Sequence, residues 1–282
     1  MAIDWNFHRG DLVKKMHDGY TALGSNHQTI FADRQKGKTH FATQDLIPVM
    51  QDEGYFCVYV DFWSKKESPG QAFTSGVIQS YNKTRLLKNA LGFSELRFIT
   101  PDAPPLNTSL GIIDNTVLTP NTAINWLLNV SDRQPIFIVL DEVQHLTTNR
   151  EFDEFTASLR SFLVNQSLLR KHLIQTLFIG SDQVRLASLF ENRKAPFYKA
   201  SYISAFEGLD KEFSDFAVDC FEQSRDINTL DKTEAYKLFK DGGRLPGRFI
   251  DLLQKMASVK RYDLIKSAQE FKYFPDETIT YR

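Results

Sequence analysis

Short apolar runs alternate with longer amphipathic stretches through the first 204 residues of the chain. This alternation predicts βα units and a mostly parallel sheet, because parallel strands are joined by crossover segments that are usually helical. The run at residues 136–140 is continuously apolar, which predicts a central strand covered on both faces. Together the runs predict strands at residues 28–32, 55–61, 135–142, 173–180 and 200–204.

Amphipathic helices are predicted between the strands and throughout the C-terminal part of the chain. Residues 152–163 place apolar side chains at helical spacing, so this segment should bury one face. The residues of that face are Phe152, Phe155, Leu159, Phe162 and Leu163. Beyond about residue 204 the strand patterns stop, and amphipathic helices are predicted around residues 213–221 and 249–256.

These patterns predict an α/β core over residues 1–204 and a small helical domain over residues 205–282. A Pro-rich stretch near residues 94–118 predicts a hairpin-like insertion into the core. The 23 phenylalanines favour a substantial apolar core, because each ring buries a large area. Cys57 and Cys220 have apolar neighbours, so we expect both to be buried rather than to form a disulfide or a metal site.

The net charge of −1 gives no overall field that would attract nucleic acid or a membrane surface. Between residues 160 and 200, however, seven basic residues stand against two acidic ones. This stretch predicts a surface for DNA phosphates or for a neighbouring subunit, with a solvated face as the alternative. No apolar run approaches the roughly 20 residues that cross a bilayer, and no signal-peptide core begins the chain. We expect a cytoplasmic protein without membrane spans.

Residues 32–39, Ala-Asp-Arg-Gln-Lys-Gly-Lys-Thr, lie between the first predicted strand and a helical stretch. They match the phosphate-loop pattern G-x-x-x-x-G-K-[ST], except that Ala32 replaces the first glycine. Gly37 lets the backbone curl so that its N–H groups face phosphate oxygens. Lys38, expected to be exposed in the loop, supplies a cation for the β and γ phosphates, and Thr39 offers a hydroxyl to Mg²⁺. An exposed basic turn is the alternative interpretation.

Acidic and hydroxyl side chains follow two of the predicted strands. Asp141 and Glu142 end the central apolar strand, where buried carboxylates are costly unless a cation or polar cleft receives them. Next to a phosphate loop, Asp141 would hold Mg²⁺ through water and Glu142 would polarise an attacking water. Ser181 follows the fourth strand and would orient that water, a role that Asp182 could share. The alternatives are ordinary acids at the start of a loop and a loop serine that is satisfied locally.

The order of these motifs resembles that of P-loop ATPases of the AAA+/STAND group, and most closely that of the archaeal-type ATPase family. The likeness runs from about Phe7 to Phe249 and includes several short motifs of that family. They are Phe7–Val13, Arg34 within the phosphate loop, Tyr59–Asp61, Leu140–Gln144, Gly180–Asp182 and Pro196–Ala200. The resemblance implies an α/β P-loop NTPase fold, with a three-layer αβα core around a mostly parallel sheet and a small C-terminal helical lid.

The resemblance also implies a set of nucleotide-binding residues and additional cations. Lys199 takes the place of an arginine that stabilises charge on the γ phosphate from a neighbouring subunit, with Arg193 in reserve; a lysine that caps the fifth strand is the alternative. Arg248 would reach the γ phosphate from the lid, with Arg244 as a second candidate and a solvated arginine as the alternative. Pro246 would pack on adenine or simply begin a helix. The residues implied to bind the nucleotide are Asp33, Arg34, Gln35, Lys36, Gly37, Lys38, Thr39 and His40, together with Pro246.

These observations predict an ATP-binding protein, with ATP, ADP and Mg²⁺ as ligands. The lysine and threonine of the loop and the strand-end carboxylates favour a Mg²⁺-dependent ATPase that acts as a nucleotide-driven switch or assembly motor. Where the family has Gly-Arg-Ala, this chain has Tyr198, Lys199 and Ala200. Ala32 and this missing Gly-Arg pair would instead fit a scaffold that binds ATP with negligible turnover. Residues 242–253 also resemble the tail of transposition-regulator ATPases, which would make DNA a partner. A homo-oligomer and a protein partner are left open.

Overall fold

The computed structural model describes residues 3–21, 25–91, 119–165, 173–225 and 230–274 of the chain. They form two compact units: a sheet unit of residues 9–32 and 39–206, and a lid unit of residues 1–8, 33–38 and 207–282. Residues 3–8 and most of the phosphate loop thus belong with the C-terminal helices, which the sequence pattern did not indicate. The division into domains at residues 1–204 and 205–282 stays a prediction. The predicted insertion near residues 94–118 lies outside the described residues.

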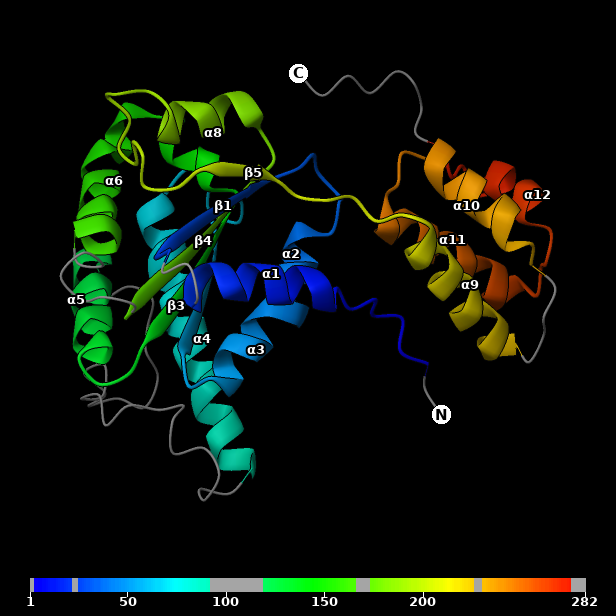
Figure 1. Ribbon diagram of the computed structural model, residues 1–282, viewed down its shortest axis with the longest axis horizontal. Helices are drawn as coiled ribbons and strands as arrows, with labels where there is room; N and C mark the ends of the chain where they lie inside the picture. The colour runs from blue at the N-terminus through cyan, green and yellow to red at the C-terminus, as the bar shows by residue number, and fades with distance from the viewer. Residues whose placement is uncertain (1–2, 22–24, 92–118, 166–172, 226–229, 275–282) are drawn as a thin grey trace. The chain divides into compact units, whose positions relative to one another are not determined.

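A five-stranded sheet of order β2-β3-β4-β1-β5 forms the centre of the sheet unit (Figure 1). Every neighbouring pair of strands is parallel. Because of this, the carboxyl ends of β1, β3 and β4, each followed by predicted site residues, lie along one edge of the sheet. The strands are β1 (His27–Phe31), β2 (Phe56–Asp61), β3 (Ile136–Asp141), β4 (Ile174–Gly180) and β5 (Ile203–Ala205).

The first four predicted strands are confirmed to within one residue at each end, whereas the fifth begins three residues later than predicted. Residues 196–200 form turns instead: the N–H of Ala200 donates a hydrogen bond to the carbonyl oxygen of Phe197 at 2.9 Å. Lys199 has a left-handed backbone with φ of +58°, which no strand contains. The extended segment therefore starts only at Ile203.

Helices cover both faces of the sheet and produce the predicted three-layer αβα arrangement (Figure 1). One layer contains α1 (Gly10–Thr21), the π-helical η1 (Phe41–Leu46), which follows the short α2 (Lys38–His40), and α3 (Ile47–Asp52). The other contains α4 (Pro69–Leu91), α5 (Pro120–Ser131), the 3₁₀ helices η2 (Val143–Thr147) and η3 (Arg150–Phe152), α6 (Asp153–Arg160), the π-helical η4 (Ser161–Asn165) and α8 (Gln183–Phe190). The helical segment predicted at residues 152–163 is confirmed as η3, α6 and η4. Its apolar face is buried except for Phe155, which is partly buried.

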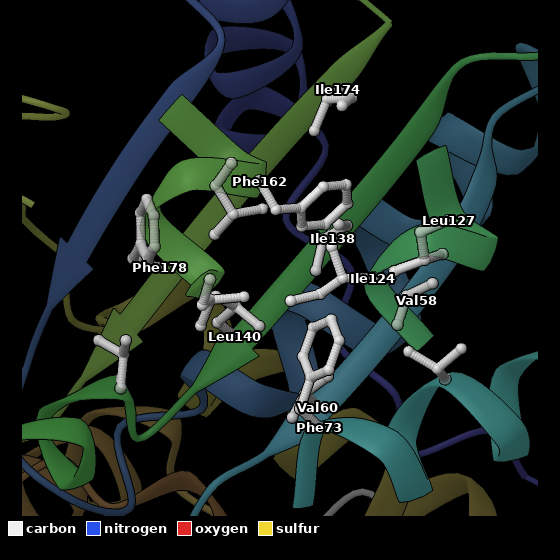
Figure 2. Close-up of a cluster of buried hydrophobic side chains, with 14 of the residues drawn as sticks. Val58, Val60, Phe73, Ile124, Leu127, Ile138, Leu140, Phe162, Ile174 and Phe178 are labelled. Atoms are coloured by element: carbon white, nitrogen blue, oxygen red, sulfur yellow. The ribbon is translucent and has the colours of Figure 1, made fainter. Parts of the chain in front are cut away.

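β3 is buried along its whole length, as its apolar run predicts. Ile136, Ile138 and Leu140 belong to the apolar cluster on one face, while Phe137 and Val139 belong to the cluster on the other. Figure 2 shows the first cluster, where side chains of β2, β3 and β4 meet those of α4, α5 and η4. The central strand is thus packed on both sides, which fixes the position of the carboxylates at its end.

In the described residues of the lid unit, four helices pack around phenylalanine rings. They are α9 (Lys211–Arg225), α10 (Lys232–Asp241), α11 (Pro246–Val259) and α12 (Leu264–Glu270). α9 and α11 confirm the amphipathic helices predicted around residues 213–221 and 249–256. Phe213, Phe239 and Phe249 lie at the centre, and the ring of Phe7 packs edge-on to Phe213 with 5.7 Å between ring centroids. This ring contact holds the N-terminal residues to the lid unit. Cys57 and Cys220 are both buried free thiols, as expected.

Replacing His27 by glutamine is expected to flatten the pH dependence of stability between pH 6.5 and pH 5. His27 begins β1 and is 8% exposed, and burial lowers its pKa to about 4. The unfolded chain takes up this proton near pH 6.5, so it binds more protons in the window, and the free energy of unfolding falls as pH decreases. His27 should contribute about 2 kcal/mol to that fall. Denaturant unfolding at the two pH values measures the contribution.

Wild type, unfolded at the same two pH values, is the reference for this variant. An equal fall in stability for wild type and His27→Gln would contradict the burial argument.

Candidate functional site

The loop between β1 and α2 has the curled backbone that its motif predicts. Gly37 has a φ of +85° and Gln35 a φ of +63°, both in the left-handed region that tightens a turn. Ala32 has no positive φ. The alanine in place of the first motif glycine therefore meets no backbone strain.

Lys38 is buried, which corrects the expectation of an exposed side chain. It is 5% exposed, and its Nζ donates a hydrogen bond to the carbonyl oxygen of Asp33 at 2.8 Å. A buried ammonium needs such an acceptor, and the curled loop supplies one from its own backbone. This hydrogen bond holds the ammonium group of Lys38 inside the loop, at the place where the motif predicts that phosphate oxygens bind.

One hydrogen bond and one close approach connect the loop to the segment that begins α11, within the lid unit. The Nζ of Lys36 donates to the carbonyl oxygen of Gly243. A Cβ added at Gly37 would lie 3.8 Å from Cγ of Pro246, in ordinary van der Waals contact. Pro246 stands in the first turn of α11, so it both begins a helix and lies against the loop. The remaining predicted loop residues Asp33, Arg34, Gln35 and His40 are exposed.

In the sheet unit, Thr39 and Asp141 meet directly although 102 residues separate them. The Thr39 hydroxyl donates to Oδ2 of Asp141 at 2.5 Å, and the phenol of Tyr59 on β2 donates to the same oxygen at 2.9 Å. The backbone N–H of Glu142 donates to Oδ1 at 2.9 Å. The threonine of the phosphate loop and the carboxylate of the central strand thus lie at one point, as predicted.

Asp141 is 3% exposed, and burial raises the pKa of its carboxyl while the hydrogen bonds from Thr39 and Tyr59 oppose that rise. Burial and the neighbouring Asp141 raise the pKa of Tyr59, so the phenol keeps its proton and remains a donor. A buried carboxylate beside a hydroxyl forms a set of hard oxygen donors, which are the ligands that Mg²⁺ prefers. The residues present therefore fit Mg²⁺, whose charge would favour the ionised carboxylate.

Glu142 and Ser181 also lie together, and Gln144 of η2 joins them. The hydroxyl of Ser181 donates to Oε2 of Glu142 at 2.7 Å. The amide Nε2 of Gln144 donates to the same Oε2 and to Oγ of Ser181, the latter at 3.2 Å. The sequence placed Gln144 and Tyr59 only inside family motifs and gave neither a role. Their one signal was position, since each stands within two residues of a strand-end carboxylate.

Asp182 does not join this cluster. Its carboxylate accepts from the backbone N–H of Arg185 at 3.0 Å as the N-cap of α8, and it pairs with the guanidinium of the same arginine. The Asp182 carboxylate is therefore used to cap the first turn of α8. No contact supports the expectation that Asp182 helps Ser181 to orient the attacking water.

The two cations expected to serve a neighbouring subunit lie on the surface of the sheet unit. Lys199 and Arg193 are exposed, and the Nζ of Lys199 lies 5.4 Å from the ring centroid of Tyr198. Lys199 stands four residues before the first residue of β5. The alternative interpretation, in which this lysine caps the start of the strand, is therefore wrong.

The two lid arginines have different surroundings. Arg244 pairs with Asp210 at 3.5 Å and donates to the hydroxyl of Tyr236 at 3.4 Å. Arg248 lines a surface cavity of about 150 Å³ together with Asp251, Leu252, Lys255, Phe271, Lys272 and Tyr273. Two positions separate Arg248 from Pro246 on α11, so the two side chains project in directions roughly 200° apart. Among the described residues, no hydrogen bond or ion pair joins either arginine to the loop, and their sensor roles stay predictions.

Two features together define a P-loop fold. One is a parallel five-stranded sheet with a curled loop between β1 and a helix, and the other is a threonine–carboxylate contact at the strand ends. Solved structures share it. A Walker-type ATPase of Pyrococcus abyssi matches with a TM-score of 0.64 and 12% identity over 94% of this chain and 71% of that chain. The ORC2 protein of Aeropyrum pernix, in ADPNP–ADP complexes, matches with a TM-score of 0.59 and 13% identity over 93% of this chain and 66% of that chain.

Domain III of the Thermotoga maritima replication initiation protein DnaA matches with a TM-score of 0.52 and 14% identity over 97% of this chain and 99% of that domain. At such identities the likeness shows the fold, and it confirms at that level the resemblance to P-loop ATPases of the AAA+ group. The narrower likeness to the archaeal-type family stays a prediction. No protein-family model and no curated protein sequence matches the chain. Among the described residues, no helix combines the length and apolar character that crossing a membrane requires.

Proposed function

We propose that this chain is a Mg²⁺-dependent ATPase in which ATP hydrolysis drives a conformational switch or the assembly of further copies. The observation that carries the proposal is the 2.5 Å contact between the Thr39 hydroxyl and Asp141, which unites the ends of two motifs distant in sequence. Thr39 and Asp141 would hold Mg²⁺, and Mg²⁺ would neutralise charge on the β and γ phosphates when bound.

The phosphate loop would bind the triphosphate through backbone N–H groups around Gly37 and through the buried cation of Lys38. The ORC2 protein of Aeropyrum pernix, which shares the fold, was solved with ADPNP and ADP. Pro246 lies against the loop at Gly37, a position from which it would also cover part of the nucleotide. These features support ATP as the ligand.

Hydrolysis would use the carboxylate of Glu142 as general base. The oxygen of a water molecule bonds to the γ phosphorus, the bond from that phosphorus to the ADP oxygen breaks, and the water proton passes to Glu142. Ser181 contacts the same carboxylate at 2.7 Å and would help to orient the water.

Phosphate release measured with and without duplex DNA tests this function against its two alternatives. Turnover without DNA supports the ATPase proposed here. ATP binding without turnover would instead indicate a scaffold, and turnover that requires DNA would indicate a DNA-loaded regulator. The exposed cations Arg193, Lys194 and Lys199 and the 89% exposed Tyr202 provide a surface for such a DNA partner.

Turnover per chain is expected to rise with protein concentration if Lys199 serves the site of a neighbouring copy. A mixture of Lys199→Ala and Lys38→Ala proteins should then recover part of the activity that each lacks, because Lys38→Ala chains still donate Lys199. A lysine lacks the guanidinium fork, so slow wild-type turnover is expected. Phosphate release over a concentration series measures this. Lys194→Ala, which removes a nearby exposed lysine, is the control, and full activity of Lys199→Ala at every concentration would exclude the role.

A further inference from the structure

Gln144 is a buried amide between two groups of the proposed catalytic centre. It lies in η2, two residues after Glu142, and is 2% exposed. Its Nε2 donates to Oε2 of Glu142 and to Oγ of Ser181, and Ser181 in turn donates to Oε2. Three side chains thus form a closed triangle of hydrogen bonds around one carboxylate oxygen.

The orientation of the Gln144 amide follows from chemistry. An ionised carboxylate only accepts hydrogen bonds, so the NH₂ group and not the carbonyl must face Glu142. Oε1 of Gln144 is left buried without a hydrogen-bond partner among the described residues. A buried acceptor without a partner costs on the order of 1–3 kcal/mol, so packing alone does not favour a glutamine here.

The backbone of Glu142 adds a second free-energy cost next to Gln144. Its backbone has φ of +53° and ψ of +41°, a left-handed conformation that a residue with a Cβ adopts at a cost of about 1 kcal/mol or more. The bond from its N–H to Asp141 holds this turn. The turn is what brings Gln144 back toward the Glu142 side chain, because it begins η2 directly at the strand end.

We propose that Gln144 is a positioning residue that fixes the Glu142 carboxylate through Oε2 and leaves Oε1 to take the proton of the attacking water. Both hydrogen bonds that described residues make to this carboxylate go to Oε2, and Oε1 receives none. This inference rests on the proposed ATPase function and adds a residue to it. Gln144 does not touch substrate; it acts through Glu142 and Ser181.

The test is the pair of variants Gln144→Met and Gln144→Glu. Methionine keeps the length and buried volume but donates no hydrogen bond, so kcat should fall about 10- to 100-fold, the range that misplacing a catalytic group produces. ATP affinity should stay within twofold of wild type, because the loop and Lys38 are unchanged. Gln144→Glu keeps the shape but places a second carboxyl group beside Glu142. The two groups would share a proton, which occupies the carboxylate that should act as the base, so turnover should fall as well. This variant is used if the methionine variant does not fold.

A double-mutant cycle separates positioning from packing. In a Glu142→Gln background, Gln144→Met should cause no further loss of kcat, because the carboxylate it positions is already gone. The matched control is Gln175→Met, which replaces a 1% exposed glutamine of β4 that hydrogen-bonds with Tyr55 and should leave kcat unchanged.

The outcomes distinguish this inference from the function on which it rests. A wild type without turnover would overturn the proposed function and the inference with it. A wild type with turnover, a dead Glu142→Gln and a fully active Gln144→Met would overturn the inference alone. Additive losses in the double mutant would assign Gln144 a role in packing and would also overturn it.

Discussion

Replacing Lys38 by methionine is expected to weaken ATP binding by on the order of 10²-fold. Charge-assisted hydrogen bonds to a phosphate contribute about 1.5–3 kcal/mol each, and methionine retains none of them. Because Lys38 is buried and not exposed, methionine is a better replacement than alanine: it keeps the stem that fills the loop. Calorimetric titration with Mg²⁺ and ATP measures the loss.

Removing the ammonium also leaves the carbonyl oxygen of Asp33 without this donor, so a local cost of about 1 kcal/mol in stability is expected alongside. Thermal melting of the variant without nucleotide separates that cost from lost affinity. Lys14→Met, at an exposed position of α1, is the matched control and should bind ATP as wild type does. Equal affinity for wild type and Lys38→Met would remove the phosphate loop from the proposed site.

The parallel sheet was predictable because burial on two faces leaves a strong trace in sequence. β3 is apolar at every position from Ile136 to Leu140, and only a central strand packed on both sides tolerates this run. β5 was misplaced because it is a short edge strand with partly exposed residues, so no apolar pattern marks its start. The turn at Lys199, with its left-handed backbone, leaves no comparable signal in the residue types.

The site was predictable where a motif fixes both residue type and place. Thr39 and Asp141 each stand at the carboxyl end of a strand or its loop, and parallel pairing brings such ends to one edge. The burial of Lys38 was not predictable, since it depends on a hydrogen bond that exists only once the loop has curled. Gln144 was missed because a left-handed turn at Glu142 decides which way its side chain faces, and glutamate seldom signals that conformation.

Replacing Glu142 by glutamine is expected to leave ATP binding intact and to lower kcat by about 10²- to 10⁴-fold, the range for removal of a general base. The hydrogen bonds around Glu142 explain why only turnover should change. The amide oxygen of the new side chain can still accept from Gln144 and Ser181 at the position of Oε2, so the triangle of hydrogen bonds survives. Its NH₂ group then occupies the position of Oε1 and presents donors to a water molecule that needs an acceptor. Phosphate release and ATP titration on one preparation measure both quantities.

Glu154→Gln, at an exposed position of α6, is the matched control and should hydrolyse ATP at the wild-type rate. The expected loss corresponds to about 3 to 5 kcal/mol in the barrier, which is too large for a side chain that only fills space. A variant that binds ATP and retains full turnover would show that Glu142 serves only to begin η2. A variant that loses ATP binding as well would mean that the left-handed turn, rather than the carboxylate, is what the substitution disturbs. Only a variant that keeps ATP binding and loses turnover would show that Glu142 accepts the proton of the attacking water.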